Sequence, residues 1–118
     1  MYANMQTKQL DVNGKMVLTC SEGYIVNRDE WSEDFVRAQA AAENLDLTDE
    51  VWDVVWFLRE FYETHGAQAE VRKIAKHFKT AWGEERGNST YLHKIFPFGG
   101  PQKQGNRLAG LMRTKGEH

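Results

Sequence analysis

Near the start of the chain, apolar and polar positions follow a short pattern that is typical of strands. Two short apolar stretches lie on either side of Asn13-Gly14, and the second stretch ends at Cys20. Asparagine and glycine adopt the positive backbone φ that a tight two-residue turn requires. The pattern predicts a β-hairpin over residues 8–20.

After the hairpin, apolar positions recur at helical spacing in segments that glycine, proline and polar residues separate. Capping residues mark where several of these segments begin and end. The predicted helices begin near Asn27 or Ser32 and end near Asn44, run from Thr48 to Gly66, span 68–82, span 89–96, and run from Pro101 to Gly110. We therefore predict a mainly α fold, an orthogonal bundle of about five short helices with a small N-terminal β-hairpin and a C-terminal arm.

The length of the chain favours a single domain over residues 1–118. We expect it to consist of the hairpin at 8–20, a helical core at 27–96, and a C-terminal helix and arm at 97–118. Trp52 and Trp56 lie four residues apart in the most apolar of the helices. Aromatic residues at this spacing usually pack inside a protein, so we expect both in the core.

Charge is distributed unevenly along the chain. Residues 1–66 contain 13 acidic and 5 basic residues, whereas residues 67–118 contain 4 acidic and 10 basic residues. Two explanations remain open, namely chance clustering on solvated faces and a basic surface that meets an acidic partner. The candidate partner-binding residues are Arg72, Lys73, Lys76, Lys79, Lys103, Arg107, Arg113 and Lys115.

Few side chains are suited to catalysis or metal binding. Cys20 is the single cysteine, which excludes an internal disulfide, and free cysteines are usually buried and inert. The histidines lack the close spacing of a metal site, so we predict no metal and no cofactor. They are His65, His77, His93 and His118. The N-terminal residues lack the apolar segment of a signal peptide, and together with the cysteine count this favours a cytoplasmic protein.

The end of the chain carries the most specific motif. It reads Ile95-Phe-Pro-Phe-Gly-Gly-Pro, continues through Lys103-Gln104, and reaches Ala109-Gly110-Leu111. Earlier landmarks in the same order are Gly23-Tyr24-Ile25 before Trp31, Leu47-Thr48 before Trp52, Phe57-Leu58-Arg59 with Tyr62, Val71-Arg72, and Asn88-Ser89 with Tyr91-Leu92. In these residues, over nearly its whole length, the chain resembles the TusE/DsrC (DsvC) family of sulfur-relay proteins.

The resemblance implies a chemistry that this chain cannot perform in the usual way. In the family, a mobile C-terminal arm carries a penultimate cysteine that holds a persulfide, and many members have a second cysteine on the preceding helix. These two positions correspond to Glu117 and Asn106 here. The family's usual Leu-Pro-Lys-Pro is Leu111-Met112-Arg113-Thr114, so two prolines are missing as well. A carboxylate cannot form a persulfide, and we expect this sulfurtransferase-like chain not to be catalytic.

The first functional hypothesis is a paralogue that binds partners of the sulfur carriers without transferring sulfur, as a regulator or competitor. The resemblance implies protein partners: a Tus/Dsr-type sulfurtransferase complex, a tRNA-thiolating enzyme or a dissimilatory sulfite reductase. We expect a monomer or weak oligomer and no membrane partner. One alternative is a sulfur carrier that uses Cys20. The other is a DNA-binding helix-turn-helix regulator of sulfur metabolism, with Ser89, Thr90, His93 and Lys94 facing the groove.

The arm itself has little to hold it in place. Apolar side chains at Leu108–Leu111 can pack, so we expect the chain to be anchored as far as this segment. Residues 113–118 offer no apolar group to bury, and ordering each of them costs about 1–2 kcal/mol in backbone entropy. We therefore expect mobility beyond Met112 in solution, and nearly unchanged thermal stability when residues 113–118 are deleted.

Overall fold

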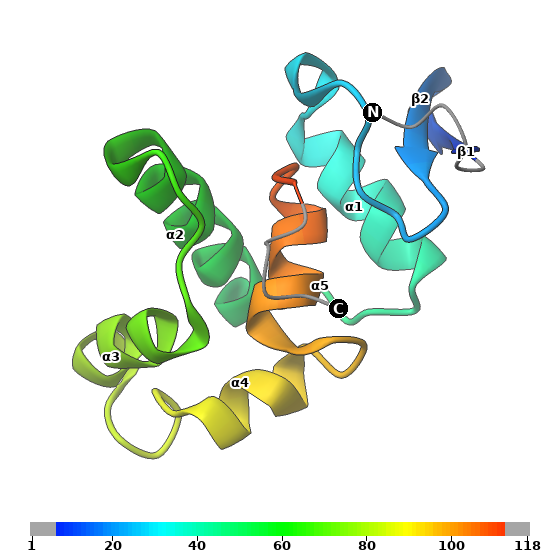
Figure 1. The fold of residues 1–118 in the computed structure, drawn as a ribbon. Coiled ribbons are helices and arrows are strands. Elements are labelled where there is room, and N and C mark those ends of the chain that lie inside the picture. The colour runs from blue at the N-terminus through cyan, green and yellow to red at the C-terminus, as the bar shows by residue number, and fades with distance from the viewer. Residues whose placement is uncertain (1–6, 113–118) are drawn as a thin grey trace.

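The chain forms an antiparallel β-hairpin that is followed by a bundle of α-helices (Figure 1). The structure is a computed structural model, and it describes residues 7–112. The elements in this range are β1 (Thr7–Val12), β2 (Lys15–Cys20), α1 (Glu33–Ala42), α2 (Asp49–His65), α3 (Val71–Trp82), α4 (Ser89–Ile95) and α5 (Gly100–Leu108). This arrangement confirms the predicted fold class.

The hairpin turns at the predicted Asn-Gly pair. Asn13 and Gly14 have φ values of 55° and 90°, and the strands pair in a register that places Val12 opposite Lys15. These positive φ values are those of the primed turns that match the twist of a hairpin. The inner face of the hairpin packs against α1, where Val17 and Phe35 belong to one buried apolar cluster.

Side-chain caps begin three of the helices, and one of them corrects the prediction for the first helix. Thr48 and Asn88 cap α2 and α4 as their sequence positions indicate. Asn27 caps only a single 3₁₀ turn, and α1 begins six residues later behind Ser32. The interruption has a physical cause, since Trp31 between them is in an extended conformation and donates its indole N–H to a carbonyl of α5.

The third helix also begins later than residue 68. α3 starts at Val71, because the preceding residues contact α5 and do not continue the helix. Ala69 is fully buried, and its carbonyl oxygen lies 3.4 Å from the side-chain nitrogen of Gln102. A tertiary contact therefore sets the boundary that helical periodicity alone misplaced.

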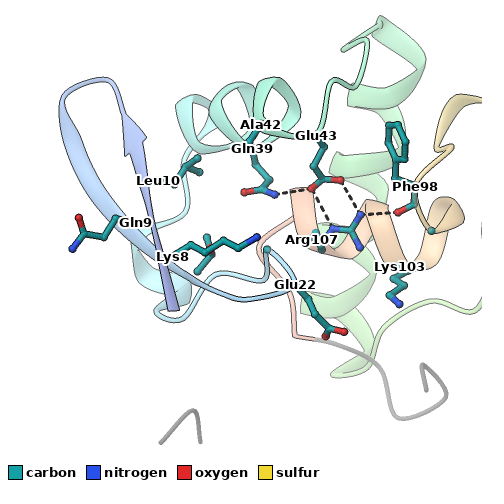
Figure 2. A pocket seen from close by; sticks show the side chains of 13 residues that line it. Lys8, Gln9, Leu10, Glu22, Gln39, Ala42, Glu43, Phe98, Lys103 and Arg107 are labelled. Carbon is teal, nitrogen blue, oxygen red and sulfur yellow. Dashed lines mark hydrogen bonds and ion pairs between the residues drawn. The ribbon is translucent and has the colours of Figure 1, made fainter. Parts of the chain in front are cut away.

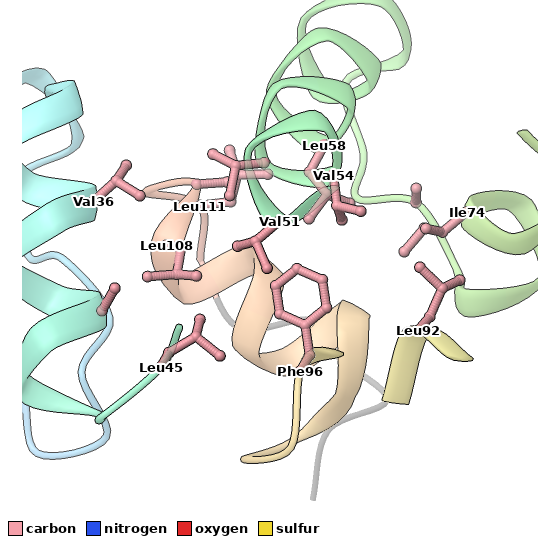
Figure 3. Packing of buried hydrophobic residues seen from close by; sticks show 14 of the residues in the cluster. Val36, Leu45, Val51, Val54, Leu58, Ile74, Leu92, Phe96, Leu108 and Leu111 are labelled. Atoms are coloured by element: carbon pink, nitrogen blue, oxygen red, sulfur yellow. The ribbon is translucent and has the colours of Figure 1, made fainter. Parts of the chain in front are cut away.

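α5 lies in the middle of the bundle and contacts each of the four other helices (Figure 1). Figure 3 shows apolar side chains from all five helices meeting around it. The labelled members include Val36, Val51, Val54, Leu58, Ile74, Leu92 and Leu108. Gly105 allows α5 to approach α2 closely, because a methyl group there would lie 2.7 Å from Leu58 Cδ1. The motif-rich end of the chain is thus the centre of the fold.

The two tryptophans of α2 do not share one environment. Trp52 is half-buried and packs against the core, whereas Trp56 is 42% exposed, so the expectation of a core position is wrong for Trp56. Trp31 packs edge-on against the Trp56 ring at 5.4 Å and Trp52 stacks on it at 6.4 Å, both between ring centroids, but these two rings leave much of Trp56 open to solvent. Among the described residues, no helix has the length and apolar character needed to cross a bilayer.

Candidate functional site

The segment that leads into the C-terminal arm is held by side chains from two other elements. The indole Nε1 of Trp31 donates to the Leu108 carbonyl at 2.8 Å, and Arg59 Nη1 donates to the Ala109 carbonyl at 2.7 Å. These are the carbonyl groups that a helix C-terminus leaves without helical partners. The Arg59 guanidinium also lies 3.6 Å from the centroid of the Trp31 ring. We call this pair the Trp31–Arg59 clamp.

The chain turns sharply beyond the clamp. Gly110 has a φ of 72°, and a methyl group there would lie 2.4 Å from the Trp31 ring, so both its conformation and its surroundings favour glycine. Leu111 is buried and donates its N–H to the carbonyl of residue 106, while the Met112 carbonyl accepts from Gln68. The chain is therefore anchored through Leu111, as expected. Arg113, Lys115, Glu117 and His118 lie outside the described residues.

Asn106 is completely buried in α5. Within the described part of the chain, neither its side-chain oxygen nor its side-chain nitrogen has a hydrogen-bond partner. Leaving a buried polar group without partners costs about 1–3 kcal/mol. An asparagine is therefore energetically poorly suited to these surroundings.

A second feature of α5 is a polar network that ties it to α1. Arg107 and Gln39 donate to the carboxylate of Glu43, directly after α1 (Figure 2). Gln104 of α5 donates to the same carboxylate. The ion pair is 2.8 Å long, and its two side chains are 8% and 13% exposed. Arg107 donates further to the Phe98 carbonyl at 2.7 Å. Residues far apart in sequence thus satisfy each other's charges inside the fold.

The charges of this network favour each other's ionised forms. Burial would raise the pKa of Glu43, but hydrogen bonds from Arg107, Gln39 and Gln104 and the charge of Arg107 lower that pKa below its usual value. Burial disfavours the charged form of Arg107 as well, yet Glu43 raises the pKa of Arg107 above its usual value. Both groups are therefore ionised at neutral pH.

A cavity of about 740 Å³ opens beside this network, between the hairpin, α1 and α5. Lys8 extends into it from β1, and Lys103 and Arg107 line it from α5 (Figure 2). The predicted partner-binding residue Arg107 is buried and paired here, so its charge serves the fold. Lys103 is half-buried in the same wall.

The predicted basic residues of α3 lie on another surface. Arg72, Lys73 and Lys76 are exposed on α3, and Lys79 on the same helix lies 3.4 Å from Glu84. Lys73 and Lys76 line a groove of about 410 Å³ between α2 and α3. The structure therefore separates the basic residues of α3 from those of α5, which sequence had grouped together.

The residues of the DNA-binding alternative are exposed on α4, namely Ser89, Thr90, His93 and Lys94. The His93 ring is engaged locally, with its Nδ1 atom 2.8 Å from the Ser89 carbonyl oxygen. Cys20, the residue of the carrier alternative, is 2% exposed at the end of β2. A thiol in this position cannot reach a donor without opening the hairpin.

Comparisons with known proteins bear on the same regions. A family model described as DsrC like protein matches residues 11–116. The chain belongs to the DsrC-like family. The matched range includes α5 and the residues directly after it. The family resemblance seen in the sequence is therefore confirmed.

Relatives and solved structures agree with this family. The chain is 40% identical over 102 residues to a sulfurtransferase TusE homolog of Haemophilus influenzae, covering 86% of this chain and 93% of that protein. It is 45% identical over 98 residues to sulfurtransferase TusE of Salmonella choleraesuis, covering 83% and 89%. These relatives are named for sulfur transfer.

Two solved DsrC structures share the fold. Allochromatium vinosum DsrC has a TM-score of 0.82 and 39% identity, with 94% of this chain and 98% of that chain covered. The oxidized gamma-subunit of the dissimilatory sulfite reductase (DsrC) from Archaeoglobus fulgidus has a TM-score of 0.83 and 31% identity, with coverage of 92% and 98%. The family match and the solved structures therefore agree on the fold of this chain.

Sequence reasoning missed both the Trp31–Arg59 clamp and the partner of Arg107. Trp31 and Arg59 were family landmarks, but nothing local showed that they meet at the end of α5. Nothing in the sequence near Glu43 indicated that it is buried, since an acidic residue after an alanine-rich helix is usually exposed to solvent. A buried arginine requires a nearby carboxylate, and that general rule is the signal that would have prompted a search for one.

Proposed function

We propose that this DsrC-like chain binds protein partners of the sulfur-relay proteins without carrying sulfur itself. The observation that carries the proposal is the state of its only thiol. Cys20 is buried at the end of β2, while asparagine and glutamate stand at positions 106 and 117, where the family resemblance places its cysteines. A carrier needs an exposed thiolate that can attack a persulfide and present it to an acceptor.

The scaffold around the missing sulfurs supports a role in binding. The Trp31–Arg59 clamp and the turn at Gly110 direct the chain out of α5. A chain that had lost every use for its arm would have no need of this support. The candidate partners are a Tus/Dsr-type sulfurtransferase complex, a tRNA-thiolating enzyme or a sulfite reductase, and the chain would act on them as a regulator or competitor.

Mass spectrometry after incubation with a persulfide donor tests the absence of transfer. We expect the wild-type chain to gain no sulfur atom, because its buried thiol does not reach the donor. Glu117→Cys is the matched positive control. Its introduced thiolate attacks the outer sulfur of the donor persulfide, the S–S bond of the donor breaks, and the rest of the donor leaves as a thiolate. A stable wild-type species that carries one additional sulfur atom contradicts the proposal, and loss of that species in Cys20→Ser assigns it to the buried thiol.

A binding measurement tests the other half of the proposal. The wild-type chain should bind a purified sulfur-relay complex from its own organism and compete with the cysteine-bearing carrier for it. The experiment is repeated with each of the three partner classes. If this chain, at saturating concentration, displaces the carrier from none of them, the protein is neither a regulator nor a competitor.

A further inference from the structure

The groove between α2 and α3 has an aromatic floor and a basic rim. Phe57 and Phe61 of α2 lie 5.8 Å apart between ring centroids, and Phe57 stacks on His77 of α3 at 4.4 Å. Phe61 in turn lies 4.3 Å from the ring of His65. The groove measures about 410 Å³. The two helices that form it, α2 and α3, lie on the side of the molecule away from the hairpin (Figure 1). A continuous row of rings thus remains accessible on the surface.

The charged side chains that line this groove are two lysines. Lys73 and Lys76 are exposed along the rim, and none of the described residues that line the groove is acidic. Neither lysine takes part in an ion pair within residues 7–112, whereas Lys79 on the same helix lies close to Glu84. An apolar floor with free cations at its edge is complementary to an apolar side chain flanked by carboxylates.

We infer that this groove docks an acidic amphipathic helix of a partner protein. The partner helix would place aliphatic or aromatic side chains at positions i, i+3 or i+4, and i+7 over Phe57 and Phe61, with glutamate or aspartate beside Lys73 and Lys76. The inference rests on the proposed function, because a protein that binds without transferring sulfur acts through such a surface. Nucleic acid is the less suitable occupant. A phosphate backbone needs a row of cations along its path, and the lining of this groove includes only two lysines.

A fluorescein-labelled synthetic peptide with this pattern tests the inference directly on the full chain. Fluorescence anisotropy should show saturable binding. A peptide of the same composition with scattered apolar residues, and one with lysine in place of each glutamate, should bind much more weakly. In ¹H–¹⁵N spectra of the chain, the peptide should shift the amides around Phe61, Lys76 and Ala81. Shifts centred on Ser89–Lys94, or displacement of the peptide by duplex DNA, overturn the inference.

Charge reversal separates the groove from general electrostatic attraction. Lys73→Glu with Lys76→Glu should weaken the amphipathic peptide at least about tenfold, because it places like charges together. Arg72→Glu is the matched control on the same helix, outside the groove. This single reversal should change binding by less than about threefold. Equal losses from Arg72→Glu and Lys76→Glu contradict the inference.

Ala81→Glu provides a variant that removes no core side chain. It introduces bulk and negative charge at an exposed residue of the groove, and binding should be lost while the thermal unfolding curve stays unchanged. Binding that survives this substitution overturns the inference. None of these measurements involves sulfur, so a sulfur-loaded wild-type chain would end the proposed function and leave the groove standing.

Discussion

Two regions of this protein hold positive charges in contrasting environments. Between α1 and α5, Arg107 is buried and donates to the Glu43 carboxylate and to the Phe98 carbonyl, while Gln39 and Gln104 donate to the same carboxylate. Between α2 and α3, Lys73 and Lys76 are exposed beside aromatic rings. Basic residues that are equivalent in a sequence therefore differ in role: one stabilises the fold, and the others are available to a partner.

The energetic rule behind this difference concerns desolvation. A buried charge is tolerated only when a partner and hydrogen bonds replace the water that it has lost, whereas an exposed charge keeps its water and contributes little to stability. Arginine suits the first position because its planar group donates to several acceptors at once. Lysine suits the second, since its charge stays hydrated until a partner arrives.

Arg107→Met should produce the largest effect, because it leaves the Glu43 carboxylate buried without its counter-charge. We expect the free energy of unfolding to fall by about 3–5 kcal/mol in urea titrations. Lys76→Met, the matched substitution on α3, should change it by less than about 0.5 kcal/mol.

The double variant Glu43→Leu with Arg107→Met sharpens the same contrast. It should recover part of the loss, since no charge then remains buried. If Arg107→Met and Lys76→Met proved equally mild, the two regions would not differ in the way described here.

Acidification should weaken the first region specifically. The folded-state pKa of Glu43 lies below its usual value, so its contribution is complete above the unfolded-state pKa of about 4.3 and is lost as pH falls through the folded value. Stability should therefore decrease below about pH 4–5.

Glu43→Gln identifies the group responsible for this pH dependence. It should be less stable at neutral pH and lose less on acidification, as measured by urea unfolding across the pH range. An unchanged pH slope in Glu43→Gln would assign the acid sensitivity to other carboxylates.

The smallest effect should come from Asn106, which adjoins Arg107 and is equally buried but has no described side-chain partner. Asn106→Cys introduces a small residue that tolerates an apolar site. We expect a gain of about 1 kcal/mol in unfolding free energy, because two unsatisfied polar atoms are removed.

A loss of stability in Asn106→Cys would show that the amide finds partners in solution, for example water. Asn106→Asp serves as the opposite control: it buries a charge at the same place and should destabilise strongly. Together the two variants measure how much the buried amide of Asn106 costs this fold.

Much of the architecture could be predicted from local signals. The Asn13-Gly14 turn fixed the hairpin, and Thr48, Asn88 and Gly66 marked helix ends, because caps and turns depend on the backbone and side chains of neighbouring residues. The motifs between Ile95 and Leu111 indicated the family before any contact was known, and the family model agrees. These features are local or arranged along the chain, so the order of residues contains them.

Only the tertiary structure decided which polar side chains are buried and with whom. The boundaries near Trp31 and Val71 shifted because these segments contact α5, and Trp56 stayed 42% exposed although the Trp31 ring packs against its edge. Arg107 appeared to belong with the lysines until Glu43, 64 residues away, was found beside it. Burial and pairing depend on residues distant along the chain, and no local periodicity records which of them meet.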